Sequence, residues 1–327
     1  MKNLIIFEYF SCKSNLDNIQ NRKIFKEGLN IASAIAKSLS DHKERKIIVL
    51  LNSGLLTKSL KNVFYLETNL KQNWIWHLKK FDPANTEIIL VAPEQLKINE
   101  KIFKILSRMR FKILGSSFKI IKTFSSKLHT YKTLQKQKIP CVETNHDPYN
   151  LKNCGQLVVM KPEHGAGSQN IKIIQKKQLL KISFPDKSYV YQPLIYGLAG
   201  SINLLCFNGK GIVIGLNKHI VKNNGKSVKQ IGSIIGGLES YREELVIMSK
   251  NICRNFPELF GFIGIDIIKD NGTWKIIEIN SRFTSTLCGL QKSYGKLIPS
   301  LIGKFYLSTP QILKKRLDFI KETKIFF

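Results

Sequence analysis

The residues best suited to chemistry are two acids and an amide, Asp266, Glu278 and Asn280, which interrupt two apolar runs in the last quarter of the chain. Asn271-Gly272 separates the runs and predicts the turn of a β-hairpin. We expect an odd-length loop centred on Gly272, because Asp266 and Glu278 both lie six residues from that glycine and then stand directly opposite each other. Side chains alternate along a strand, so Asn280 shares their face.

Two carboxylates and an amide oxygen on one face suit a hard divalent cation, and Mg²⁺ bridging nucleotide phosphates is the usual case. The isoleucines of the two runs fall on the opposite face and can pack into a core: Ile265, Ile267, Ile277 and Ile279. A hairpin whose polar face simply meets water is the alternative. The absence of a basic residue beside the two acids favours the metal site, and Arg282 just beyond them is placed to bind an anion.

A second candidate site is the glycine-rich segment 163–170, which lies between predicted strands at 157–162 and 171–174. It has neither the GxxxxGK[ST] pattern of a Walker A loop nor a GxGxxG opening a helix. Backbone N–H groups of Gly165, Gly167 and Ser168 can still meet phosphate oxygens, and Lys161 at the end of the preceding strand supplies positive charge.

Composition argues against several classes of protein. The 327 residues are 43% hydrophobic, and no apolar run approaches the roughly 18 residues that span a bilayer. Residues 1–9 predict a first strand and not a signal peptide, because Glu8 follows only four apolar residues, so we expect a cytoplasmic protein with no membrane partner. The six cysteines are scattered without CxxC spacing, so no zinc or disulfide framework is predicted.

The formal charge of +29 invites a nucleic-acid interpretation. Only eight of the 52 basic residues are arginines, however, and the lysines are spread along the whole chain. No RNA-binding aromatic set or zinc finger is present, so no specific nucleic-acid partner is predicted. The charge would still attract anionic substrates.

The elements that must position these residues form a mixed α/β chain, with an α+β C-terminal part. Strands at 3–7, 46–51, 63–65, 87–91 and 111–114 alternate with helices at 22–39, 73–80 and 98–109, which predicts a parallel sheet in residues 1–115. Ligands of such sheets lie at the carboxyl ends of strands, which places Glu8, Asn52-Ser53 and Glu94 near a site. We expect a small unit at 116–190, a β-rich unit at 191–305 and a basic tail at 306–327.

The order of these features resembles the ATP-grasp superfamily over roughly residues 90–290. The resemblance implies a Rossmann-like pre-ATP-grasp domain at 1–115, a small lid domain at 116–190 and a C-terminal domain at 191–305 that carries the metal site. It also implies roles for particular residues. Lys127 and Lys161 would contact the nucleotide phosphates, and Arg282 would lie near the reacting phosphate. Asp266, Glu278 and Asn280 would bind the metal ion. The other contacts to the nucleotide would come from Gln192, Pro193, Leu194, Ile195 and Ser201.

Two positions depart from the superfamily pattern. Ser126 precedes the first lysine where aspartate is usual, and Pro193 stands at a hinge position that is often glutamate. Neither position belongs to the metal site, so the departures concern the geometry of the adenine and the affinity for the nucleotide.

Several short motifs resemble one branch of the superfamily, which contains the tyramine–L-glutamate ligases of methanofuran biosynthesis. They include Phe7-Glu8-Tyr9, Ala92-Pro93-Glu94 and Thr284-Ser285-Thr286. The branch implies an ADP-forming carboxylate–amine ligase that works through an acylphosphate and joins glutamate to tyramine or tyrosine. Lys161 and Arg282 would be its catalytic groups.

The resemblance also implies the cofactors and partners. These are ATP, one or two Mg²⁺ ions with Mn²⁺ as an alternative, and small amino-acid and amine substrates. The oligomeric state stays open, although a homodimer is common in the superfamily. The general base stays open between His164 and His219. Two alternatives also stay open: an ATP-grasp ligase that adds an amino acid to another cofactor or peptide, and a non-catalytic nucleotide-binding member.

Overall fold

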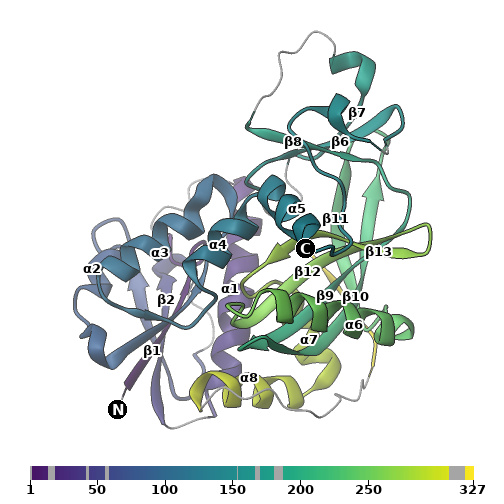
Figure 1. The fold of residues 1–327 in the computed structure, drawn as a ribbon. Coiled ribbons are helices and arrows are strands. Elements are labelled where there is room, and N and C mark those ends of the chain that lie inside the picture. The colour runs from purple at the N-terminus through teal and green to yellow at the C-terminus, as the bar shows by residue number, and fades with distance from the viewer. Residues whose placement is uncertain are drawn as a thin grey trace.

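The computed structural model describes residues 2–13, 19–41, 44–55, 59–152, 154–165, 170–179, 187–308 and 321–327. These residues form three sheets of five, three and six strands, with helices between and around them (Figure 1). The predicted mixed α/β fold is confirmed. No helix in these ranges combines the length and the apolar character that crossing a membrane requires.

The N-terminal sheet is parallel, with strand order β3-β2-β1-β4-β5. Its strands are β1 (Lys2–Glu8), β2 (Arg45–Asn52), β3 (Val63–Thr68), β4 (Thr86–Val91) and β5 (Lys112–Ile113). The helices of this part are α1 (Ile19–Leu39), α2 (Trp74–Leu78) and α3 (Ile98–Arg108), with 3-10 turns η1 (Ser53–Leu55), η2 (Pro83–Asn85) and η3 (Gln95–Lys97).

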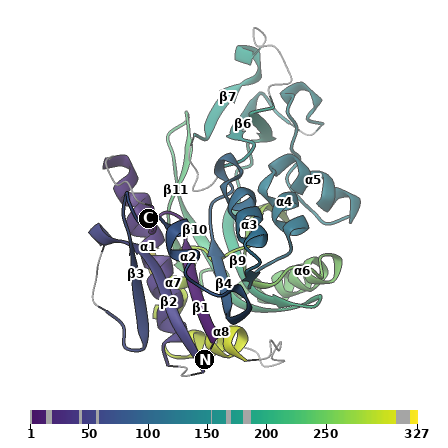
Figure 2. The same ribbon diagram turned by 90° about the vertical axis from the view of Figure 1, so that its left-hand side faces the viewer.

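Both faces of this sheet are covered, which explains why β1 is apolar throughout its middle. Leu4 and Ile6 pack with residues of α1, whereas the alternating residues Ile5 and Phe7 pack with residues of α2 and α3. In Figure 2, α1 and α3 lie on opposite sides of β1 and β4. The carboxyl ends of β1 and β4 bring Glu8 and Glu94 to the same edge.

A smaller unit stands above the rest of the molecule in Figure 1. It is an antiparallel sheet of order β7-β6-β8 with its own small cluster of buried side chains, Leu151, Val158, Leu179 and Tyr191. Its strands are β6 (Leu157–Pro162), β7 (Lys172–Gln175) and β8 (Tyr189–Pro193), with 3-10 turns η4 (Pro148–Asn150) and η5 (Lys176–Leu179). Two helices precede it, α4 (Phe118–Ser125) and α5 (Lys127–Lys136).

The C-terminal sheet has the order β13-β12-β9-β10-β11-β14, and all its neighbours are antiparallel. Its strands are β9 (Leu198–Phe207), β10 (Lys210–Asn223), β11 (Val228–Ile235), β12 (Gly261–Asp270), β13 (Thr273–Asn280) and β14 (Thr323–Phe326). Its helices are α6 (Arg242–Asn255), α7 (Thr286–Tyr294) and α8 (Leu297–Leu307), with the 3-10 turn η6 (Glu239–Tyr241) before α6.

One face of this sheet is packed against helices along its length. The other face is packed at one end and lines a cavity at the other end. Ile263, Ile265 and Ile267 of β12 pack with side chains of α4, α5 and α6. On the opposite face, Phe262 packs with α7 and α8, while Asp266 lies farther along the same strand in a cavity. The site is therefore the uncovered end of a sheet face whose other end is core.

One hydrophobic cluster joins the five-stranded and six-stranded sheets. It contains Leu4 and Ile35 from the N-terminal part and Phe262 and Ile302 from the C-terminal part. Helix α1 contacts both α7 and α8, and the side-chain amide of Gln291 on α7 donates to the carbonyl of Ala34 at 2.6 Å. The two sheets share a core around α1.

The hairpin of β12 and β13 places Asp266 directly opposite Glu278, as predicted. The predicted odd-length loop is wrong, because Asp270 pairs with Thr273 and leaves only two loop residues. Both of them, Asn271 and Gly272, have positive φ (46° and 81°), as a tight hairpin turn requires.

A β-bulge restores the expected pairing of the two acids. The register shifts between Asp266 and Ile267, so that Ile267 pairs with Ile276 and Ile277 is the extra residue. Ile276 is consequently buried in the core. Ile277, predicted to share the core face, instead lines the cavity beside Glu278.

The end of the chain contributes to the C-terminal sheet. Within the predicted tail of 306–327, α8 continues to Leu307 and Thr323–Phe326 forms β14. This strand pairs with Gly232 to Ile235 of β11. Residues 309–320 lie outside the described residues.

Candidate functional site

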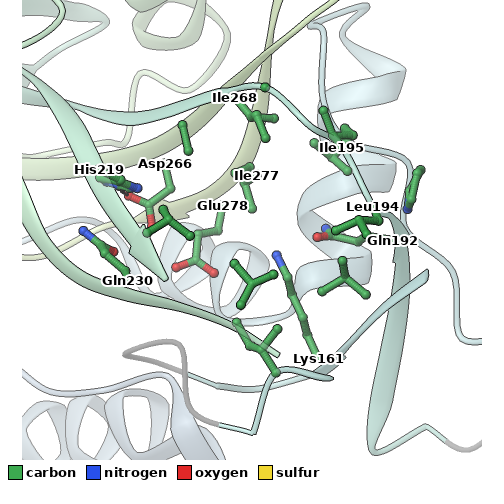
Figure 3. Close-up of a pocket in the computed structure, with 18 of the residues that line it drawn as sticks. Lys161, Gln192, Leu194, Ile195, His219, Gln230, Asp266, Ile268, Ile277 and Glu278 are labelled. Atoms are coloured by element: carbon green, nitrogen blue, oxygen red, sulfur yellow. Dashed lines mark ion pairs between the residues drawn. The ribbon is translucent and has the colours of Figure 1, made fainter. Parts of the chain in front are cut away.

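A cavity of about 370 Å³ lies between the three-stranded sheet and the open end of the six-stranded sheet (Figure 3). Nine of the predicted site residues line it: Lys127, Lys161, Gly165, Gln192, Pro193, Leu194, Ile195, Asp266 and Glu278. Residues from five elements and from the segments after β6 and β8 therefore meet in one space, although they are spread over more than 150 positions of the sequence.

A row of polar residues crosses the six-stranded sheet at this end. Asp266 stands opposite Glu278 on one side and opposite Ser201 on the other, and Ser201 stands opposite Asn217. Directly opposite residues share a face. Ser201 is buried, and its hydroxyl accepts a hydrogen bond from the Asn217 amide at 3.1 Å. The structure thus places Ser201 in the sheet beside Asp266 and not among the residues that line the cavity.

The two acids are close enough to affect each other's ionisation. Burial and the charge of Glu278 raise the pKa of Asp266 well above its usual range. Burial would also raise the pKa of Glu278, but Lys127 and Lys161 outweigh it and lower that pKa. Nε2 of His219 lies 3.8 Å from Asp266 Oδ1, and burial lowers the pKa of this histidine to about 4. The two lysines therefore favour a negative charge on Glu278 over one on Asp266.

This donor set fits a divalent cation that also binds phosphates. Two carboxylates on neighbouring strands repel each other, and a cation between them would relieve the repulsion. The amide of Asn280, whose nitrogen lies 3.5 Å from Glu278 Oε1, adds a third oxygen. In the described ranges no group of three or more His, Cys, Asp or Glu side chains is arranged to hold a metal. Phosphate oxygens and water would therefore have to complete the coordination.

The two predicted lysines reach the cavity from different elements. Lys127 opens α5, whose N-cap is Ser126, and its ammonium donates to the Gly165 carbonyl at 3.1 Å and lies 3.7 Å from Glu278 Oε2. Serine at 126 still caps the helix by accepting from the backbone N–H of His129 at 3.0 Å.

Lys161 is the penultimate residue of β6, and in Figure 3 its ammonium points toward Glu278. Burial lowers the pKa of Lys161 to about 8, and the neighbouring charge of Lys127 acts in the same direction, while Glu278 opposes the shift. Two cations and two acids therefore face one another in one cavity. Of the predicted glycine-rich loop, Gly165 lines the cavity, whereas Gly167 and Ser168 lie outside the described residues.

The segment after β8 forms one wall of the cavity. This wall consists of Pro193, Leu194 and Ile195, with Gln192 at its beginning. The Gln192 side chain is buried and donates to the Thr144 hydroxyl at 2.9 Å. Other apolar side chains complete a slot that suits a planar ring: Val142, Val159, Ile268 and Ile277. Sequence reasoning missed these four as site residues, because nothing local distinguishes them from core residues.

Arg282 has a different position from the one expected of an anion clamp. It is outside the residues that line the cavity, and its Nε and Nη2 donate to the two carboxylate oxygens of Glu94 at 2.9 and 2.7 Å. Burial alone would lower the pKa of Arg282, but Glu94 outweighs it and raises the pKa. Glu94 lines neither cavity, so its expected place near the site stays a prediction, and its pairing with Arg282 was not foreseen.

A second cavity of about 520 Å³ adjoins the first and shares Pro162 and Gly165 with it. Residues 95–97 after β4 form one side, and residues 187–189 form another. His164 lines this cavity, and its Nδ1 donates to the Ser125 carbonyl at 2.9 Å. Burial lowers the pKa of His164, so Nε2 is an unprotonated acceptor at neutral pH.

Comparison with known proteins identifies a family match and two similar enzymes. Residues 124–286 match the family of ATP-grasp domains. A tyramine–L-glutamate ligase of Methanocaldococcus fervens is 26% identical over 226 residues, which are 69% of this chain and 67% of the relative. The enzyme of the same name from Methanocaldococcus jannaschii is 24% identical over 294 residues, which are 88% of this chain and 84% of the relative.

Solved structures share the fold at lower identity. An ATP-grasp superfamily protein from Archaeoglobus fulgidus superposes with a TM-score of 0.73 at 18% identity, covering 100% of this chain and 92% of that one. The biotin carboxylase domain of a Hydrogenobacter thermophilus 2-oxoglutarate carboxylase, solved with MgADP, has a TM-score of 0.68 at 14% identity and covers 95% and 70%.

Proposed function

Residues 124–286 are an ATP-grasp domain, and from this premise we propose that the protein is a ligase that joins a carboxylate to an amine and releases ADP and phosphate. One observation carries the proposal: two lysines and two opposed acids converge in one cavity with an apolar slot. That combination matches the parts of a nucleoside triphosphate, which has a planar ring at one end and a chain of negative charges at the other.

The adenine fits the apolar slot between Val159 and Ile268, against the wall formed by Leu194. The phosphates then extend toward Lys127 and Lys161. Each ammonium now faces Glu278, and phosphate oxygens would offer a stronger partner for both. The glycine at 165 lets the backbone approach the phosphates closely.

The acid pair is the place for the metal. Asp266, Glu278 and Asn280 would hold Mg²⁺, which when bound supplies positive charge to the β- and γ-phosphates. Lys161 holds a further positive charge inside the cavity, where a low dielectric strengthens its attraction for the transferring phosphoryl group.

The chemistry proceeds in two displacements. A carboxylate oxygen of one substrate attacks the γ-phosphorus, the bond from phosphorus to the bridging oxygen breaks, and ADP leaves with that electron pair. The amine of the second substrate then attacks the acylphosphate carbonyl, an amide forms and inorganic phosphate leaves. The residues contribute by holding the reactants in line and by neutralising charge.

The second cavity suits the amino-acid substrate, because it opens on the phosphate end of the first at Gly165. Lys97 and Lys187 line it and favour an acidic molecule such as glutamate. His164 presents Nε2 there and would take the proton that the attacking amine loses. The names of the two Methanocaldococcus relatives support glutamate as the acid and tyramine as the amine.

The test is an assay of ADP and phosphate release with pairs of acids and amines, including glutamate with tyramine and glutamate with tyrosine. We expect turnover that needs both substrates and Mg²⁺, with an amide product detected by mass spectrometry. Release of AMP would contradict the acylphosphate route. Turnover with a different pair of substrates would support the proposed ligase function but contradict glutamate and tyramine as its substrates. Stabilisation by ATP without turnover for any pair would indicate a non-catalytic nucleotide-binding protein.

A histidine variant tests the placement of the second substrate. His164→Gln keeps an acceptor for the second cavity but removes the base, so we expect kcat to fall about 10²-fold while the ATP KM stays the same. His146→Gln is the control, because His146 makes the same type of bond from Nδ1 to a carbonyl, that of Tyr189 at 2.7 Å, and lines neither cavity.

A further inference from the structure

We propose that Glu94 is a positioning residue, which fixes the orientation of the Arg282 guanidinium so that its remaining N–H groups can bind the reacting phosphate once the substrates are present. The inference rests on the ligase function proposed above. Arg282 lies two residues beyond Asn280, the last residue of β13, whereas Glu94 lies three residues beyond the end of β4 in the N-terminal sheet. The contact joins residues 188 positions apart, so it links the five-stranded sheet to the strand that carries the metal ligands.

The geometry of the contact leaves part of the guanidinium available. Glu94 takes Nε and Nη2, at 2.9 and 2.7 Å, and the Phe283 carbonyl accepts from Nη1 at 3.2 Å. A guanidinium has five N–H groups, so one on Nη1 and one on Nη2 have no partner among the described residues. Those two nitrogens form the end of the fork, which binds carboxylates and phosphates in a bidentate manner. Glu94 therefore fixes one side of the guanidinium and leaves one N–H on Nη1 and one on Nη2 for a ligand.

Both partners are well buried, with side-chain exposures of 14% for Arg282 and 8% for Glu94. Water competes weakly for such a pair, and its two parallel hydrogen bonds define one orientation. The backbone of Arg282 is also anchored, because the next residue, Phe283, stacks on Phe262 with 4.9 Å between ring centroids. Arg282 is thus fixed at its guanidinium by Glu94 and at its backbone by the neighbouring Phe283.

The backbone after Glu94 gives independent support. Leu96 and Lys97 are consecutive residues in the left-handed region, with φ of 52° and 57°, and neither is glycine. Backbone strain of this kind persists where function requires it. Burial of Leu96 does not explain it, since this side chain is 69% exposed. A hydrogen bond from the Lys97 N–H to the Glu94 carbonyl, at 3.0 Å, ties the strained residues to Glu94 itself.

The chain offers a matched control for the test. Arg242 donates from Nε and Nη2 to the two carboxylate oxygens of Glu239 at 2.6 and 2.8 Å, which is the same arrangement away from both cavities. We expect Glu94→Gln to lower kcat about 10- to 100-fold, with the ATP KM within about twofold of wild type. Glu239→Gln should leave both constants within about twofold.

A double-mutant cycle distinguishes positioning from a separate role. If Glu94 acts through Arg282, Glu94→Gln should change kcat less than about twofold when Arg282 is already lysine. Full loss in that background, or wild-type kcat in the Glu94→Gln protein, would overturn the inference. Glu94→Asp should recover part of the loss, because it restores the charge.

A crystal structure of the Glu94→Gln protein decides the question without turnover. The glutamine NH₂ faces the donors of Arg282, so the guanidinium should leave its position. A guanidinium that stays in place would overturn the inference. If the wild-type protein releases no ADP with any substrate pair, the proposed ligase function fails, and the position of Arg282 in that crystal structure still decides whether Glu94 positions it.

Discussion

The ammonium of Lys127 lies 3.7 Å from the carboxylate of Glu278, so the helix that begins at this lysine contacts the acid that faces Asp266. In this state the positive and negative groups of the cavity neutralise one another. ATP and a divalent cation would replace those contacts by binding the lysines and the acids separately. The following predictions test the parts of this arrangement.

Glu278→Gln should abolish Mg²⁺-dependent turnover. The variant keeps the size of the side chain but removes the carboxylate charge that Lys127 and Lys161 stabilise. We expect kcat for ADP release to fall by about 10² or more at saturating ATP and Mg²⁺. Glu244→Gln is the control, because Glu244 pairs with Lys269 on the surface. Residual activity near that of the control would show that Glu278 does not hold the metal.

Lys161→Met should weaken ATP binding more than it changes folding. Methionine fills a similar space without the charge that would meet the phosphates. The increase in melting temperature that saturating ATP gives the wild-type protein should shrink or vanish, while the melting temperature without ATP stays close to wild type. Lys172→Met, at an exposed position on β7, should retain the full increase. Equal shifts in the two variants would exclude Lys161 from the nucleotide site.

Gly197→Ala should damage the wall of the nucleotide cavity. A Cβ at this position would collide with the backbone carbonyl of Lys269 on β12, and a backbone atom cannot rotate away. We expect a loss of about 1–3 kcal/mol of unfolding free energy and weaker ATP binding. Gly155→Ala is the control, since nothing lies within 4 Å of a Cβ there. Urea denaturation and calorimetric titration with ATP measure the two effects.

Glu8 should make stability fall as pH rises from about 4.5 to 7. Burial raises the pKa of Glu8 to about 7, although N–H groups of Phe10 and Ser11 bind its carboxylate. In that range the folded chain therefore holds a proton that the unfolded chain releases, and the difference approaches the order of 3 kcal/mol. Below pH 4.5 both states are protonated and the contribution disappears.

The measurement is the unfolding free energy of wild type and Glu8→Gln across pH 4–8. The difference in free energy between the two proteins should change most between pH 4.5 and 7. A difference that does not vary with pH would show that Glu8 ionises at its ordinary pKa. Glu67→Gln, at an exposed position on β3, should leave the wild-type slope unchanged.

Local patterns were enough to predict the central part of the site. Apolar runs, a strand that ends at Lys161 and the Asn-Gly turn are all features of a few neighbouring residues, and they singled out Lys161, Asp266 and Glu278, which the structure brings into one cavity. Lys127 was identified from the resemblance to the ATP-grasp superfamily and not from a local pattern. Such patterns give the type of an element because side-chain periodicity is local.

Features that depend on distant partners were not predictable in this way. The bulge at Ile277 allows Asp266 to pair with Glu278 although the turn has only two residues. No residue pattern within the hairpin predicts this bulge. The pairing of Glu94 with Arg282 needs two sheets to be placed first. Strand β11 was not predicted because Lys229, Gln230, Gly232 and Ser233 interrupt its apolar residues on both faces, and β14 was not predicted because it is a short edge strand.

The shared core around α1 has a consequence for how the molecule loses its structure. Because one cluster contains side chains of both large sheets, these should unfold in a single cooperative transition, and amide hydrogens of β1 and β12 should exchange with similar protection. Among the described residues, the three-stranded sheet has a cluster of four buried side chains, which is much smaller than the shared core, so its amides should exchange sooner. Opening of the nucleotide cavity would then be a local fluctuation against a rigid base, with the strand that carries Lys161 moving and the strands that carry the acids at rest.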